Sequence, residues 1–119
     1  MECKDIALLA AKALDDKRAK DIVCLKVDEM TVITDYMVIA TGTSAPQVKA
    51  LCETVEDELA KADAFARRRE GVNDGHWCVL DYGDVMVHVF HEQDREYYQL
   101  ERLWADGTNE VQVDYDAEA

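Results

Sequence analysis

The spacing of apolar residues along the chain predicts three helices, over residues 4–16, about 45–63 and about 92–105. Ser44 and Gln47 fit a capping box at the start of the second helix, where Pro46 falls in the first turn. Apolar stripes mark the inward face of each helix: Ile6, Leu9, Ala10, Ala13 and Leu14; Val48, Leu51, Cys52, Val55, Leu59 and Ala62; Tyr97, Leu100, Leu103 and Trp104.

Other stretches have the shorter apolar runs and alternation of strands. Strands are expected over 21–28 and 35–42, and the second is apolar almost throughout, as in a strand covered on both faces. Residues 64–71 predict only a weak edge strand, and residues 77–82 and 84–90 predict a hairpin. The order of elements indicates a single α/β domain, a mixed β-sheet of about five strands flanked by helices.

The hairpin HWCVLDYGDVMVHVF separates into two faces because side chains alternate along a strand. A two-residue loop at Tyr82-Gly83 would place Trp77 opposite His88 and Val79 opposite Met86. One face is then entirely apolar: Cys78, Leu80, Val85, Val87 and Val89. The other mixes large apolar groups with acids: Trp77, Val79, Asp81, Asp84, Met86, His88 and Phe90. Either a helix covers part of this second face, or it is open for binding.

Catalytic and metal chemistry are poorly supported by the hairpin. Asp81 and Asp84 flank a tight turn, where Asp commonly bonds nearby backbone amides, so we interpret them as turn formers. A metal site built from His76, Cys78, His88 and His91 is disfavoured because Cys78 and His88 point to opposite faces. We therefore expect no catalytic residues, metal ligands or cofactor.

Charge and composition narrow the functional classes. The 119 residues carry 13 basic and 26 acidic side chains, a net charge of −13, which disfavours high-affinity binding to nucleic acid and favours a basic protein partner. Apolar runs are too short to cross a membrane and the N-terminus does not resemble a secretion signal, so a cytoplasmic location is expected. The four scattered cysteines are then expected to be reduced thiols, and the acidic tail 107–119 to be flexible.

The turn Thr41-Gly42-Thr43-Ser44 joins a strand to a helix N-terminus, a geometry that can bind phosphate. It is similar to the Gly-Ser turn of nucleotidyltransferases, which also need an acid–x–acid pair on the next strand to hold two metal ions. No such pair follows here. Capping explains Ser44, and an added contact role for Thr43 and Ser44 remains an alternative.

Several separated motifs resemble the Iojap family, whose bacterial members are called ribosome silencing factors (RsfS). The resemblance covers residues 4–105 and rests on DIV, DYMVIATGTSAPQV, the EG of residues 70–71, WCVLDYGDVMVHVF and LERLW. It implies a nucleotidyltransferase-like fold without the catalytic acids. Segment 62–69 departs from the family pattern because it is more charged than the usual edge strand.

The resemblance also implies a function and a contact surface. Family members bind the large ribosomal subunit through its ribosomal protein number fourteen, block joining of the small subunit and repress translation when nutrients run short; organellar relatives assist large-subunit assembly. Carried over by position, the surface would include Trp77, Asp81 and Tyr82, with Glu70, Met86 and His88 as neighbours. Two alternatives stay open: an active nucleotidyltransferase that binds Mg-nucleotide at Thr41–Ser44, and a homodimer through the hairpin face.

Overall fold

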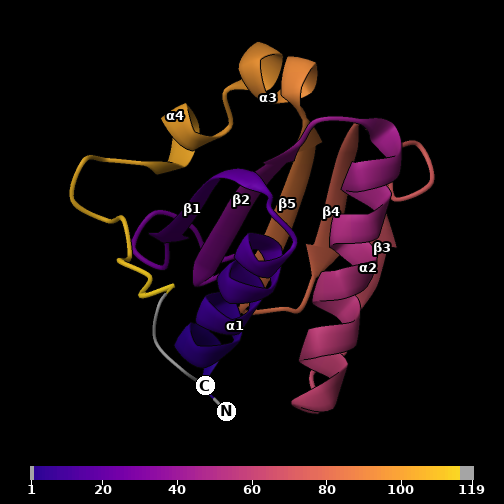
Figure 1. The fold of residues 1–119 in the computed structure, drawn as a ribbon. Coiled ribbons are helices and arrows are strands. Elements are labelled where there is room, and N and C mark those ends of the chain that lie inside the picture. Colours follow the sequence, from indigo (N-terminus) through magenta and orange to yellow (C-terminus); the bar gives the residue numbers. More distant parts are fainter. Residues whose placement is uncertain (1, 116–119) are drawn as a thin grey trace.

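The fold is a five-stranded mixed sheet with helices packed against it, as the apolar pattern predicted (Figure 1). The computed structural model describes residues 2–115. Its strands lie in the order β1-β2-β5-β4-β3, with β2 and β5 parallel and the other neighbours antiparallel. The elements in chain order are α1 (Cys3–Asp16), β1 (Lys20–Lys26), β2 (Tyr36–Gly42), α2 (Ala45–Lys61), β3 (Arg68–Glu70), β4 (Trp77–Asp81), β5 (Val85–His91), α3 (Glu92–Tyr98) and α4 (Glu101–Trp104).

Helices α1 and α2 lie side by side on one face of the sheet (Figure 1). The start of α2 is fixed by Ser44, whose hydroxyl accepts a hydrogen bond from the Gln47 backbone N–H at 3.2 Å. The Gln47 side chain accepts hydrogen bonds from Thr43 instead of from the Ser44 backbone, so only the Ser44 half of the predicted capping box forms. Within residues 2–115, no helix is both long and apolar enough to cross a bilayer.

The main core lies between these two helices and the sheet. Every residue of β2 is buried, which confirms the prediction of a strand covered on both faces. At the edge of this layer the Arg69 guanidinium bonds both carboxylate oxygens of Glu56, at 2.9 and 3.0 Å, and ties the short strand β3 to α2.

A smaller apolar cluster lies on the other face of the sheet. Leu100 and Trp104 of the C-terminal segment pack over residues of β1, β2 and β5, among them Met37, Ile39 and Phe90. Arg95, which is buried, donates hydrogen bonds to the Thr41 hydroxyl and to Glu101. The C-terminal segment therefore covers only part of this face. This agrees with the interpretation that a helix lies over part of the second face of the hairpin.

The predicted continuous helix over 92–105 was wrong. The chain forms α3 and α4 as separate helices because Gln99 adopts a left-handed conformation with φ of 47°. This break changes the phase of the apolar stripe, so Leu100 turns inward while Tyr97 and Leu103 remain exposed.

The segment after α4 packs against β1. The Lys26 N–H donates to the Asn109 carbonyl at 2.9 Å, and the Val111 N–H donates to the Cys24 carbonyl at 2.7 Å. Val111 and Val113 also contact the main core. Residues 109–113 are thus bound to the domain, unlike the flexible tail expected over 107–119, and residues 116–119 of that prediction lie outside the described residues.

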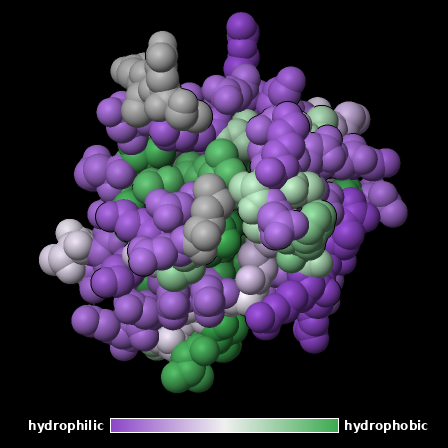
Figure 2. Space-filling view, turned by 90° about the horizontal axis from the view of Figure 1, so that it is seen from below, coloured by the Kyte–Doolittle hydropathy of each residue, from purple (hydrophilic) through white to green (hydrophobic). Residues whose placement is uncertain are grey.

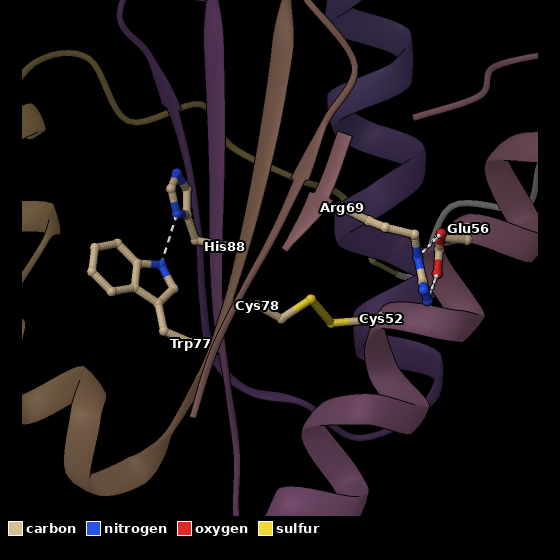
Figure 3. The surroundings of a disulfide bond; sticks show 6 residues. All are labelled: Cys52, Glu56, Arg69, Trp77, Cys78 and His88. Carbon is tan, nitrogen blue, oxygen red and sulfur yellow. Dashed lines mark hydrogen bonds and ion pairs between the residues drawn. A yellow bond between two sulfur atoms is a disulfide. The ribbon is translucent and has the colours of Figure 1, made fainter. Parts of the chain in front are cut away.

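The prediction of four reduced thiols was wrong for one pair. Cys52 of α2 and Cys78 of β4 are joined by a disulfide in the buried core (Figure 3). Their separation of 26 positions gives no sign of pairing, which depends on the side chains that meet where α2 packs on β4. Cys3 and Cys24 are free.

Candidate functional site

The register of the hairpin is shifted by two residues from the prediction. Trp77 lies opposite Phe90, Val79 opposite His88, and Asp81 opposite Met86. The central residues of the loop are Gly83 and Asp84 instead of Tyr82 and Gly83, because Gly83 supplies the positive φ of 88° that the turn needs. A shift by two leaves each side chain on its predicted face.

The structure gathers most of the predicted contact residues on one side of the sheet. We call this surface the open face and define it as Glu70 of β3, Trp77, Val79 and Asp81 of β4, and Met86 and His88 of β5. Glu70 pairs with Val79, which places the edge strand in line with the hairpin. Trp77, Val79, Asp81 and Met86 are partly exposed, Glu70 is exposed, and His88 is buried.

Trp77 is the largest side chain of the open face and is held on three sides. Its ring stacks on Phe90 with centroids 4.9 Å apart, and it lies 4.8 Å from the ring of Tyr98. Its indole N–H donates to Nδ1 of His88 at 3.1 Å (Figure 3). These contacts fix the orientation of an aromatic group that is still partly exposed.

Tyr98 is a residue that the sequence reasoning missed. The helical periodicity placed Tyr97 inward, whereas Tyr98 packs on Trp77 and Tyr97 is 80% exposed. Because Gln99 is left-handed, the helical periodicity of α3 does not continue into α4. No sequence signal indicated this break.

His88 is neutral in this environment. Burial lowers the pKa of its imidazole to about 4. Because the Trp77 indole can only donate, Nδ1 of His88 must accept, and the ring proton is on Nε2. Nε2 is buried and has no hydrogen-bond partner among residues 2–115.

Asp81 has the turn-forming role that was predicted. Its Oδ1 accepts a hydrogen bond from the Gly83 N–H at 2.8 Å. The carboxylate is partly exposed at the tip of the hairpin, where it contributes negative charge to the open face.

Tyr82, which the resemblance grouped with Trp77 and Asp81, lies on the opposite side of the sheet. Its ring packs against the main core beneath the helices. Burial and the nearby Glu56 of α2 raise the pKa of its hydroxyl to about 12. The structure therefore separates Tyr82 from the other predicted contact residues.

The hydroxyls of Thr43 and Ser44 are engaged in local bonds at the start of α2. The Thr43 hydroxyl donates to the Gln47 side chain at 2.8 Å, and the Ser44 hydroxyl accepts from the Gln47 backbone. The preceding Thr41 hydroxyl is bonded to Arg95. This geometry is explained by helix capping and by the attachment of α3.

The four residues weighed as metal ligands do not meet at one point, although His76 and His91 are neighbours with ring centroids 6.1 Å apart. Cys78 is bonded to Cys52 on the helix side, and His88 is bonded to Trp77 on the open face. Nδ1 of His76 lies 3.1 Å from the Asp94 carboxylate. Within the part of the chain that the structure describes, no group of three or more His, Cys, Asp or Glu side chains could hold a metal ion.

Comparison with known proteins gives one consistent result. The family model described as "Ribosomal silencing factor during starvation" matches residues 1–119. Ribosomal silencing factor RsfS of Bacillus subtilis is 41% identical over 106 residues, covering 89% of this chain and 90% of that protein. The chloroplastic protein Iojap of Zea mays is 33% identical over 108 residues, covering 90% of this chain and 46% of that protein.

Solved structures agree with the fold. A crystal structure of a Chromobacterium violaceum protein superposes with a TM-score of 0.86 at 37% identity, covering 100% of this chain and 96% of that one. A Bacillus halodurans protein gives a TM-score of 0.80 at 34% identity, covering 92% and 99%. The resemblance seen in the sequence motifs is thus confirmed over the whole domain, and the chain belongs to the family of ribosomal silencing factors.

Proposed function

We propose that this protein acts in the cytoplasm as a translational repressor that binds the large ribosomal subunit through ribosomal protein number fourteen. The open face is the proposed docking surface, and its occupation sterically prevents the small subunit from joining when nutrients are limiting. A role in large-subunit assembly is compatible with the same contact. Membership of the ribosomal silencing factors supports this proposal at the level of the family.

The observation that carries the assignment is the arrangement around Trp77. A partly exposed tryptophan, held in place by Phe90, Tyr98 and His88, presents a fixed aromatic surface on the open face, with Val79 as the next residue of that face along β4. Aromatic side chains of this kind are frequent hot spots because they bury a large area at small entropic cost. Asp81 and Glu70 add acidic groups to the same face.

Charge favours a basic protein as the partner. The net charge is −13, and hydrophilic residues cover most of the surface seen in Figure 2. Such a field accelerates the approach of a basic protein and opposes contact with bare phosphate. We infer that the protein recognises the subunit by a ribosomal protein instead of by RNA.

The proposed mechanism is steric and requires no catalysis. The nucleotidyltransferase alternative loses support because the Thr41, Thr43 and Ser44 hydroxyls are bonded to Arg95 and Gln47. The homodimer alternative would use the open face itself, so a dimer and the ribosome would compete.

Cosedimentation with purified large subunits tests the proposal. We expect the wild-type protein to sediment with the large subunit and to prevent added small subunits from joining it. Trp77→Ala should weaken binding by more than about 1 kcal/mol, since it removes the central aromatic contact. Phe65→Ala is a matched control, because Phe65 is 67% exposed in the connection between α2 and β3.

The outcome separates the site from the function. Circular dichroism must first show that Trp77→Ala is folded, because the substitution also removes contacts to Phe90 and Tyr98. Undiminished binding by the folded variant would contradict the assigned surface. Failure of the wild-type protein to bind large subunits would contradict the function.

A further inference from the structure

An apolar cavity of about 200 Å³ opens beside the hairpin on the side of the sheet that carries the open face. Its walls come from the loop before β2, from β2 and β5, and from the C-terminal segment. Its lining includes Ile33, Met37, Met86, His88, Leu100 and Trp104. Sites for drug-sized ligands usually measure about 300–1,000 Å³, so this cavity suits a single large side chain better than a cofactor.

His88 places an unused hydrogen-bond donor at the wall of this cavity. Its Nδ1 accepts from Trp77, so Nε2 carries the proton and lies on the side of the ring away from Trp77 (Figure 3). Along β5, the neighbours of His88 on this face are Phe90 on one side and Met86 on the other. Trp77 pairs with Phe90, whereas Met86 lines the cavity together with His88. His88 therefore lines the cavity, and its Nε2–H, which is covered in the free protein, has no partner among residues 2–115.

An unpaired buried donor is costly, and a bound group can recover that cost. Buried polar groups in folded proteins nearly always have partners, and each exception requires an explanation. An oxygen atom that enters the cavity would supply the missing acceptor. Met86, which is partly exposed and has a flexible thioether side chain, can move to admit it.

The cavity is continuous with the proposed docking surface, because Met86 and His88 belong to both. Its rim is also apolar and accessible: Ile33 is 70% exposed, and its loop neighbour Val32 is fully exposed. A protein docked on the open face would therefore cover the mouth of the cavity. The acidic surface selects a basic protein as that partner.

We propose that this cavity receives one apolar side chain of the docked ribosomal protein, and that Nε2–H of His88 donates a hydrogen bond to a backbone carbonyl of the inserted segment. This inference rests on the proposed function. It adds a second anchor point, distinct from the aromatic surface of Trp77, and assigns His88 a role in binding besides its contact with Trp77.

Filling the cavity tests the proposal. Thr31 lines the cavity from the loop, and Thr31→Phe should occupy the space and weaken binding to purified large subunits at least tenfold. Two variants serve as controls. Thr31→Val removes the Thr31 hydroxyl, which accepts a hydrogen bond from the Ile33 N–H, but does not fill the cavity. Val32→Phe adds a phenyl ring at the neighbouring position, outside the cavity lining. Both controls should bind within about threefold of wild type, a change below the level of a hot spot.

The stability of each variant is checked by thermal unfolding, and Ile33→Trp blocks the mouth from its exposed side if Thr31→Phe is unstable. Nitrogen-15 NMR of the free protein should show the His88 proton on Nε2, and adding purified ribosomal protein number fourteen should shift this resonance and slow its exchange. Wild-type affinity of the filled variants, or a proton on Nδ1, would overturn the inference. If Trp77→Ala still weakens binding in that case, the proposed function stands without the cavity.

Discussion

The two faces of the central sheet use the same strands for different purposes. Along β4 and β5 the helix-side residues Cys78, Leu80, Val85, Val87 and Val89 are at most 1% exposed. On the open face, Trp77, Val79, Asp81 and Met86 are partly exposed and include an acid and an aromatic side chain. Figure 3 shows Trp77 and Cys78, neighbours in β4, on opposite sides of the sheet. Strand alternation thus places buried core side chains and the side chains of the proposed docking surface at neighbouring positions of the same strand.

Each face of the sheet keeps one buried polar atom without a hydrogen-bond partner within residues 2–115, the Tyr82 hydroxyl on the helix side and Nε2 of His88 on the open face. On the helix side, Arg69 and Glu56 form a paired contact at the edge of the layer. On the open face, His88 is buried with one nitrogen bonded and the other without a partner in the described part of the chain. In the proposed complex, the docked protein would supply the missing partner of Nε2 of His88.

The largest effect is expected when neighbouring residues of β4 are truncated on opposite faces. Leu80→Ala should lower the free energy of unfolding by about 2–5 kcal/mol, because Leu80 is fully buried under the helices and its loss leaves a cavity. Val79→Ala should cost about 1 kcal/mol or less, since Val79 is partly exposed. Urea unfolding of both variants measures the difference.

Equal destabilisation by Val79→Ala and Leu80→Ala would contradict the difference in burial between the two faces. A folded Leu80→Ala protein should also bind large subunits as well as wild type, because the open face keeps its residues. Weaker binding by Leu80→Ala would show that the two faces are coupled.

Much of this contrast was predictable from the sequence because it depends on local patterns. The alternation in WCVLD and VMVHVF assigned each side chain to its face even though the predicted register was two residues off. The first two helices followed from apolar periodicity and from the Ser44 cap.

Features that depend on tertiary packing were not predictable. The left-handed Gln99 is stabilised in a segment where buried Arg95 bonds Thr41, 54 residues earlier in the chain. The contact of Cys52 with Cys78 and the position of Tyr82 under α2 likewise depend on how the helix packs on the sheet. The environment of His88 depends on the position of Trp77. That position is set by the hairpin turn, which determines the residue of β5 that pairs with Trp77.

The next effect, of intermediate size, is the pH dependence that His88 confers. Burial holds the imidazole pKa at about 4, compared with 6.5 for an unperturbed group. Between these values the unfolded chain binds a proton that the folded protein does not, so acidification favours unfolding. His88 should therefore contribute a loss of stability on the order of 3 kcal/mol as the pH falls from 6.5 to about 4, and no pH dependence above this range.

The measurement compares wild type with His88→Gln, which can accept the Trp77 hydrogen bond but does not titrate. Urea unfolding at several pH values gives the difference in stability between the two proteins, and the shared effect of the acidic residues cancels. A difference that does not change between pH 6.5 and about pH 4 would show that His88 is not buried as a neutral ring.

The smallest effect is expected at Tyr82, and it tests the most specific difference between the two faces. The Tyr82 hydroxyl is buried on the helix side without a hydrogen-bond partner among residues 2–115, and burial together with Glu56 raises its pKa to about 12. Tyr82→Phe removes an unsatisfied polar atom and keeps the ring, so the free energy of unfolding should be unchanged or higher by up to about 1 kcal/mol. Large-subunit affinity should stay at the wild-type value, because Tyr82 lies outside the open face. A Tyr82→Phe protein that is stable but binds poorly would place the hydroxyl in the interface, and the docking surface would then have to extend around the hairpin tip to the helix side.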